Sequence, residues 1–240
     1  MSDTRSTGIG EFRGDIEGLR ALAVVLVVLF HAEVPWLDGG FVGVDVFFVI
    51  SGFLITRLLL LECVRTQSLS LRQFWARRVR RLLPNAALTL LTVAAFGFFF
   101  LDPVSMQQAG KDVTAAALFV ANFWFRSRAN DYFDEDADRS GVLHFWSLSV
   151  EEQYYLLWPP LLAAFLVMQL RAKHSLPVIF RRAFVILSVC AALSFGWFVK
   201  NAIASPIVGY YATQARLWEL AAGGLIAFSL HGGYGGPLRS

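Results

Sequence analysis

The sequence predicts an all-α protein, a polytopic bundle of transmembrane helices with about six spans and one re-entrant segment. Hydrophobic residues make up 56% of the 240 residues and charged residues only 16%, and the mean hydropathy is +0.55. This balance differs strongly from that of soluble domains. Long uncharged runs alternate with groups of arginines, as expected for spans and the loops between them. The formal charge of +3 is modest, and no distributed basic face predicts nucleic-acid binding.

Three uncharged runs predict spans directly. Residues 82–101, 153–170 and 183–199 are 20, 18 and 17 residues long, near the roughly 20 that cross about 30 Å of hydrocarbon. Three further runs are interrupted by charges. We expect a membrane domain over residues 1–230 and a polar, glycine-rich tail at 231–240, with spans at about 17–33, 43–61, 83–101, 147–170, 183–199 and 211–230.

The interrupted spans carry ionisable groups, which mark candidate functional positions in a membrane. The first ends at Glu33, the second holds Asp45 and Arg57, and the last holds Arg216 and Glu219. A signal peptide is a second interpretation of the first span, but no small-residue cleavage site follows it and more hydrophobic spans do. Arg216 and Glu219, three residues apart, can pair with each other or serve a site.

Basic residues predict the orientation. Arginines precede the first span, crowd residues 57–81 and recur at 171–182, and the positive-inside rule places all three groups, and the N-terminus, in the cytoplasm. The uncharged segment 113–125 is too short to cross, so we expect it to re-enter from the outer side, before a solvated acidic loop at 131–138. The two cysteines lie apart, without ligand spacing, and imply neither a disulfide framework nor a metal site.

Candidate reactive groups gather at the predicted outer level. Arg20 and His31 are eleven residues apart, so they share one helix face about 16 Å apart along the axis. Asp45 lies at the level of His31, while Ser147, Glu151 and Tyr155 follow an i, i+4, i+8 line. A carboxylate beside an imidazole fixes its tautomer and raises its basicity, which suits a general base for a hydroxyl.

Each of these groups also has a simpler interpretation. Arg20 can extend to the headgroups while His31 only ends its helix. Glu151 and Glu152 can serve the dipole of a helix N-terminus that Ser149 caps. On the cytoplasmic side, the chain has 18 arginines against 3 lysines, and guanidinium groups suit phosphate and anionic lipid alike. The densest group is Arg77, Arg78, Arg80 and Arg81.

Four stretches resemble a known family, in order and spacing, from about residue 12 to residue 228. They are "FRGDIEGLRALAVVLVVLFHAEVPWLDGGFVGVDVFFVISGFLITRLLL", "FWARRVRRLLP", "LHFWSLSVEEQYYLLWP" and "YYATQARLWELAAGGLIA". The chain resembles the acyltransferase-3 membrane proteins of the OafA/YrhL type. The resemblance implies a multi-pass protein of the bacterial inner membrane that O-acetylates a carbohydrate such as lipopolysaccharide O-antigen, peptidoglycan or an exported polysaccharide. It implies cytoplasmic acetyl-CoA as the donor.

The resemblance also assigns residues. The family's arginine, ten residues, histidine signature falls on Arg20 and His31. Its RxxR motif falls on Arg78 and Arg81, and Arg77 and Arg80 fit the same spacing. Its serine and glutamate motif falls on Ser147, Ser149 and Glu151, followed by Tyr155. We therefore expect substrate contact by Tyr155. The residues with expected catalytic roles are His31, Asp45, Glu151, Ser147 and Ser149. The residues expected to bind the donor are Arg20, Arg78, Arg81, Arg77 and Arg80.

The family's membrane domain usually has about ten helices, often followed by an extracytoplasmic SGNH hydrolase-like domain, so we expect this chain of about six helices to be a truncated form. Two other functions fit the residues. A transporter or exporter of an anionic solute would use Asp45, Glu151 and Glu219 as proton or ion sites. A noncatalytic partner subunit would associate with a longer acyltransferase.

Overall fold

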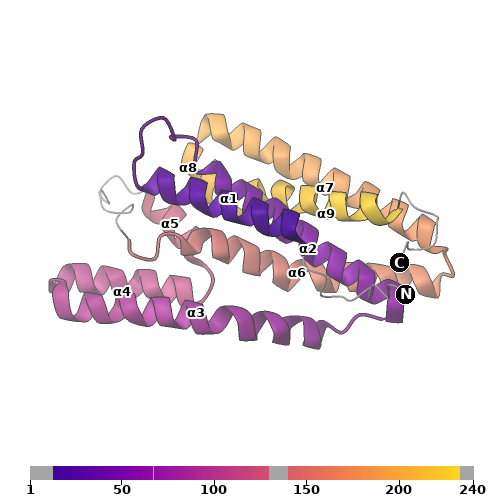
Figure 1. Cartoon of the computed structure of the whole chain (residues 1–240), viewed down its shortest axis with the longest axis horizontal. Coiled ribbons are helices and arrows are strands. Elements are labelled where there is room, and N and C mark those ends of the chain that lie inside the picture. The colour runs from indigo at the N-terminus through magenta and orange to yellow at the C-terminus, as the bar shows by residue number, and fades with distance from the viewer. Residues whose placement is uncertain (1–12, 67, 130–139, 233–240) are drawn as a thin grey trace, which may run out of the picture. The chain divides into compact units, whose positions relative to one another are not determined.

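The computed structural model describes residues 13–66, 68–129 and 140–232, and this part of the chain consists of helices joined by short turns and loops, without strands. Figure 1 shows the helices in chain order. They are α1 (Gly14–His31), α2 (Val42–Thr66), α3 (Leu71–Phe100), α4 (Pro103–Ala117), α5 (Ala121–Ala129), α6 (Phe145–Arg171), α7 (Leu176–Ala204), α8 (Pro206–Tyr211) and α9 (Thr213–Gly232). The predicted all-α class is confirmed. The expected acidic loop at 131–138 and most of the tail lie outside the described residues.

Four of the described helices, α2, α3, α6 and α7, are long and apolar enough to cross a membrane. The expected spans at 17–33 and 211–230 fall on α1 and α9. α1 is apolar over most of its 18 residues but carries three charged residues near its start, Asp15, Glu17 and Arg20, and is not among these four helices. The count of six spans stays a prediction.

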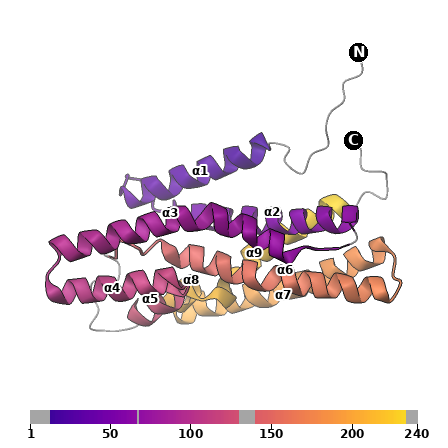
Figure 2. The ribbon, with the colours of Figure 1, turned by 90° about the horizontal axis from the view of Figure 1, so that it is seen from below.

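The segment expected to re-enter the membrane is divided between two helices. α4 ends at Ala117 and α5 begins at Ala121, and Phe119 between them has a φ of 54°, the left-handed backbone that stops a helix. α4 itself starts earlier than expected, because Asp102 caps it by accepting the Val104 and Ser105 N–H groups and Pro103 occupies its first turn. Figure 2 shows α4 turning back alongside the second half of α3.

The helices form two compact units. The first comprises Met1–Leu69, Leu161–Leu193 and Trp218–Ser240, and the second comprises Ser70–Pro160 and Ser194–Leu217. α6, α7 and α9 therefore each contribute to both units.

Glycines bring the helices of the first unit together. A Cβ on Gly52 of α2 would overlap the backbone carbonyl of Leu220 in α9, and a Cβ on Gly223 of α9 would overlap the carbonyl of Val49 in α2. α1 meets the start of α2 in the same way, where Gly43 lies against the Ala23 carbonyl. Small residues that let backbones touch are the usual basis of helix association in membranes.

Candidate functional site

The predicted line along α6 is present in the second unit. Tyr155 Oη donates a hydrogen bond to Glu151 Oε2 at 3.2 Å. The Tyr155 side chain is only 2% exposed, and Glu151 is half-buried. The i, i+4 spacing thus brings the carboxylate and the phenol together, as expected for one helix face.

α3 docks on α6 at the same tyrosine. Pro159 lies inside α6 and has no backbone N–H, so the carbonyl of Tyr155, four residues earlier, lacks its usual helical donor. The indole Nε1 of Trp75 supplies the missing hydrogen bond to that carbonyl at 3.0 Å. Three residues along α3, the guanidinium carbon of Arg78 lies 3.8 Å from the centre of the Tyr155 ring, a close cation–π contact. Trp75 and Arg78 together fix the arginine-rich helix on α6.

This docking distinguishes the four arginines of the RxxR region. Arg78 is half-buried and its Nε is enclosed, without a hydrogen-bond partner in the described part of the chain. Arg77, Arg80 and Arg81 are exposed. Of these, Arg80 donates from Nε to the Ala76 carbonyl at 3.1 Å. Arg78 therefore contacts the protein interior, while the exposed three are open to an anionic ligand or to headgroups.

The two serines of the α6 motif differ. Ser149 is fully buried, donates to the Phe145 carbonyl at 2.8 Å and accepts the Ala121 N–H at 3.2 Å. It thus satisfies a backbone donor at the start of α5. Ser147 is half-buried and donates to the His144 carbonyl at 3.1 Å. These contacts favour a positioning role for Ser149 over a reactive one.

The first unit holds the other predicted groups. His31 is exposed at the end of α1, with Nδ1 2.8 Å from the Val27 carbonyl oxygen. A carbonyl can only accept, so Nδ1 carries the proton and Nε2 of the neutral ring is the free base. Arg20 Nη1 pairs with Glu17 Oε1 at 3.1 Å, and Asp45 is half-buried in the first turn of α2.

The predicted gathering of His31 and Asp45 with Ser147 and Glu151 stays a prediction, since it joins groups from both units. Within the second unit, the described contacts bring together Arg78, Tyr155 and Glu151.

A polar junction that the sequence did not predict links three helices of the second unit. Gln153 Nε2 donates to Asn122 Oδ1 at 2.9 Å and to the Phe119 carbonyl at 3.0 Å. Thr213 Oγ1 donates to Gln153 Oε1 at 2.7 Å and accepts from Asn122 Nδ2 at 2.9 Å. α5, α6 and α9 are tied together by this closed set. Gln153 is a polar residue at the start of the uncharged run 153–170, and this was the only signal in the sequence. Nothing in the sequence marked Asn122 or Thr213 as its partners.

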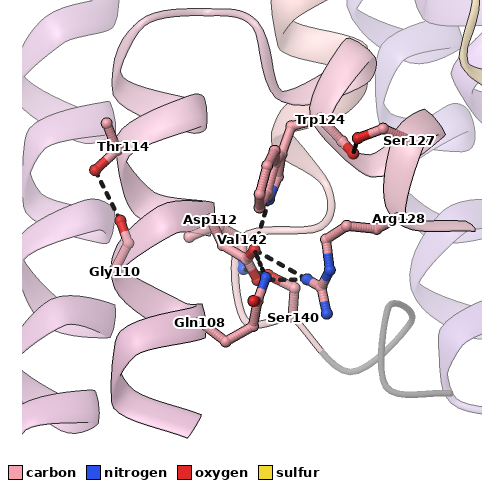
Figure 3. A network of polar contacts seen from close by, with 9 residues as sticks. All are labelled: Gln108, Gly110, Asp112, Thr114, Trp124, Ser127, Arg128, Ser140 and Val142. Carbon is pink, nitrogen blue, oxygen red and sulfur yellow. Dashed lines mark hydrogen bonds and ion pairs between the residues drawn. The ribbon is translucent and has the colours of Figure 1, made fainter. Parts of the chain in front are cut away.

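A second missed network joins α4 to α5 (Figure 3). Arg128 Nη1 lies 2.9 Å from both carboxylate oxygens of Asp112, and the two side chains are 7% and 5% exposed. Trp124 Nε1 donates to Asp112 Oδ1 at 2.8 Å, and Gln108 Nε2 donates to it at 3.2 Å. The buried charge is thereby paired and hydrogen-bonded, as burial of a carboxylate requires.

Arg216, predicted either to pair with Glu219 or to serve a site, has aromatic partners. Its Nε donates to the Tyr210 carbonyl at 3.0 Å. Its guanidinium carbon lies 5.2 Å from the centre of the Tyr210 ring and 5.6 Å from that of Trp146. Arg216 is 5% exposed. These rings give the buried cation a favourable environment.

Comparison with known proteins gives consistent results. The model of a family described as "Acyltransferase domain" matches residues 13–239. A protein of Listeria monocytogenes named "Peptidoglycan O-acetyltransferase OatA" is 38% identical over 215 residues, which cover 89% of this chain and 33% of the relative. Staphylococcus aureus "O-acetyltransferase OatA" is 37% identical over 213 residues, 89% of this chain and 34% of the relative. The chain spans about a third of the length of these relatives. No solved structure matches it significantly.

Proposed function

Because the chain belongs to the acyltransferase-3 family, we propose that it acts as a membrane O-acyltransferase on a cell-envelope or exported carbohydrate. The match over residues 13–239 carries the proposal, supported by the names of the OatA relatives. Acetyl is the proposed acyl group and acetyl-CoA the proposed donor. Peptidoglycan is the first acceptor to test, because the Listeria relative is named for it.

His31 is the proposed general base. Its Nδ1–H is held by the Val27 carbonyl, so Nε2 can take the proton of an acceptor hydroxyl. The hydroxyl oxygen then bonds to the acyl carbon, the carbon–sulfur bond of the thioester breaks, and the sulfur leaves as a thiol with the proton returned by the imidazolium. Asp45 or Glu151 would stabilise that imidazolium. Ser147 would contact the acceptor, together with Tyr155.

The exposed arginines are the proposed donor site. Arg77, Arg80 and Arg81 are open to the phosphates of acetyl-CoA, and guanidinium groups bind phosphate through paired hydrogen bonds. Arg20 would join them. Arg78 is assigned a positioning role, because it lies against Tyr155. The basic segments predict that the donor side and the N-terminus face the cytoplasm. The proposed location of the chain is the bacterial inner membrane.

The first test is O-acetylation of surface polysaccharide in a bacterial host that lacks a homologue. We expect the wild-type chain and His174→Ala to acetylate, and His31→Ala to lose activity about 100-fold or more, the usual contribution of a general base. His174 is the matched control because it lies in the turn between α6 and α7. Wild-type rates from His31→Ala would remove His31 from the mechanism. Solute uptake without covalent change would favour a transporter.

A further inference from the structure

A groove of about 450 Å³ lies in the first unit, between the end of α6 and the beginning of α7. α6 contributes Phe165 and Gln169 to its lining, and α7 contributes the others, which are Arg181, Arg182, Val185 and Ile186. Val185 and Ile186 are 55% and 51% exposed. None of these residues has a part in the proposed acyl transfer, so the groove needs its own explanation.

The polar end of the groove is cationic. Arg182 Nη1 donates to Gln169 Oε1 at 2.6 Å and lies 3.2 Å from Nε2 of His174, so Gln169 and His174 hold it in place. Arg181 is exposed and has no ion pair within the residues that the structure describes. The stretch 161–193 contains no aspartate or glutamate at all. The chain itself supplies no acidic group from this stretch to neutralise the two arginines.

The other end of the groove is apolar and lies along two helices that can cross a membrane. Phe165 is one to two turns before the end of α6, and Ile186 is about one turn beyond Arg182 in α7. An occupant must therefore be anionic at the helix ends and apolar toward the interior of the helix pair. A phospholipid has this division, with a phosphate at headgroup depth and acyl chains beside it.

We propose that this groove is a binding site for one anionic phospholipid. Its phosphate lies between Arg181 and Arg182, and one acyl chain runs along Phe165, Val185 and Ile186. None of the groove's lining residues is among the arginines assigned to the proposed donor site, which are Arg20, Arg77, Arg80 and Arg81. The inference does not depend on the proposed function.

The test is native mass spectrometry of the 240-residue chain, titrated with phosphatidylglycerol or phosphatidylcholine of equal chain length. We expect one phosphatidylglycerol to bind preferentially. Arg181→Gln/Arg182→Gln should weaken that binding roughly 10- to 30-fold, since each basic residue at an anionic headgroup contributes about fivefold. The matched control is Arg171→Gln/Lys173→Gln, which removes the same charge near the junction of α6 and α7 but from outside the groove.

A second variant tests the apolar half. Ile186→Trp fills the groove without changing charge and should also reduce phosphatidylglycerol binding, while thermal unfolding of each variant in detergent checks folding. An equal loss of phosphatidylglycerol binding in the control and in Arg181→Gln/Arg182→Gln would show that the effect depends only on net charge, and would overturn the proposal. So would unchanged binding in Ile186→Trp. If acetyl-CoA displaces phosphatidylglycerol one for one, the groove is a donor site and the lipid assignment is wrong.

Discussion

Two regions of the protein hold helices together by opposite means. In the first unit, α2 and α9 touch backbone to backbone, because Gly52 and Gly223 have no Cβ. In the second unit, side chains join the helices, through the junction of Asn122, Gln153 and Thr213 and through the Asp112–Arg128 pair. The glycine contact has no room for an added methyl group. In the polar contacts, removal of one hydrogen-bonding or charged group leaves its buried partner unsatisfied.

The difference reflects the solvent. Lipid tails are as apolar as leucine, so burial alone does not favour one helix pair over another, and close packing or hydrogen bonding must do so. We therefore expect the first unit to be sensitive to added volume and the second to lost polar groups.

The largest effect is expected from Arg128→Met. It leaves the Asp112 carboxylate buried without its cation, and removing one partner of a buried ion pair costs about 3–5 kcal/mol. The free energy of unfolding in detergent measures it. Adding Asp112→Leu to the same chain should recover most of the loss, because the uncompensated charge is then gone. A double variant no more stable than Arg128→Met would contradict this account of the second unit.

Gly52→Ala should be next. The new methyl group would overlap the Leu220 carbonyl, so α2 and α9 must separate, and overpacking of this kind costs about 1–3 kcal/mol. Gly196→Ala in α7 is the control, because nothing lies within 4 Å of its Cβ position. Unfolding measurements should give a loss for Gly52→Ala only. Equal stability of the two variants would mean that α2 and α9 are not in close contact.

A smaller and more specific effect is expected at Trp75. Trp75→Phe removes the donor to the Tyr155 carbonyl and should cost about 1–2 kcal/mol, as for a part-buried acceptor left unsatisfied. In a Pro159→Ala background, residue 159 regains an N–H for that carbonyl, so Trp75→Phe should then cost almost nothing. A double-mutant cycle measures this coupling. Additive effects would show that the indole does not replace the missing helical donor.

The smallest effect is pH-dependent and lies at an exposed cap. Hydrogen bonds from Ser105 and from the Val104 N–H lower the pKa of Asp102 below its usual value. The cap therefore stabilises α4 above the unfolded pKa, and this contribution is lost as pH falls through the lowered folded pKa. The protection of the α4 amides against exchange, relative to their intrinsic rates at each pH, should fall on acidification below about pH 4, and less so in Asp102→Asn. An unchanged profile in both proteins would exclude the cap as the cause.

The sequence predicted features that depend on composition and short spacing. The all-α class followed from the uncharged runs, and the contact between Glu151 and Tyr155 followed from their i, i+4 separation. The single segment at 113–125 was expected because it lacks charge. Its division at Phe119 depends on backbone conformation, which hydropathy does not report.

Contacts between distant residues were not predictable from one sequence. Gln153 and Thr213 are 60 residues apart and Asn122 and Thr213 are 91 apart, and no local pattern links them. The burial of Arg78 was missed for a related reason. Arg78 is brought to α6 by the hydrogen bond from Trp75 to the Tyr155 carbonyl, which Pro159 leaves without a helical donor. Trp75 and Arg78 lie on α3 and Pro159 lies on α6, so no local pattern links them.

The sharing of α6, α7 and α9 between the units has a consequence for recombination. Three of the four unit boundaries, those after Pro160, Leu193 and Leu217, fall inside a helix. No single crossover in a chimera with a relative can exchange one unit and keep the other. Viable chimeras should therefore take the whole stretch from α1 to α9 from one parent. In recombination the two units should be exchanged together.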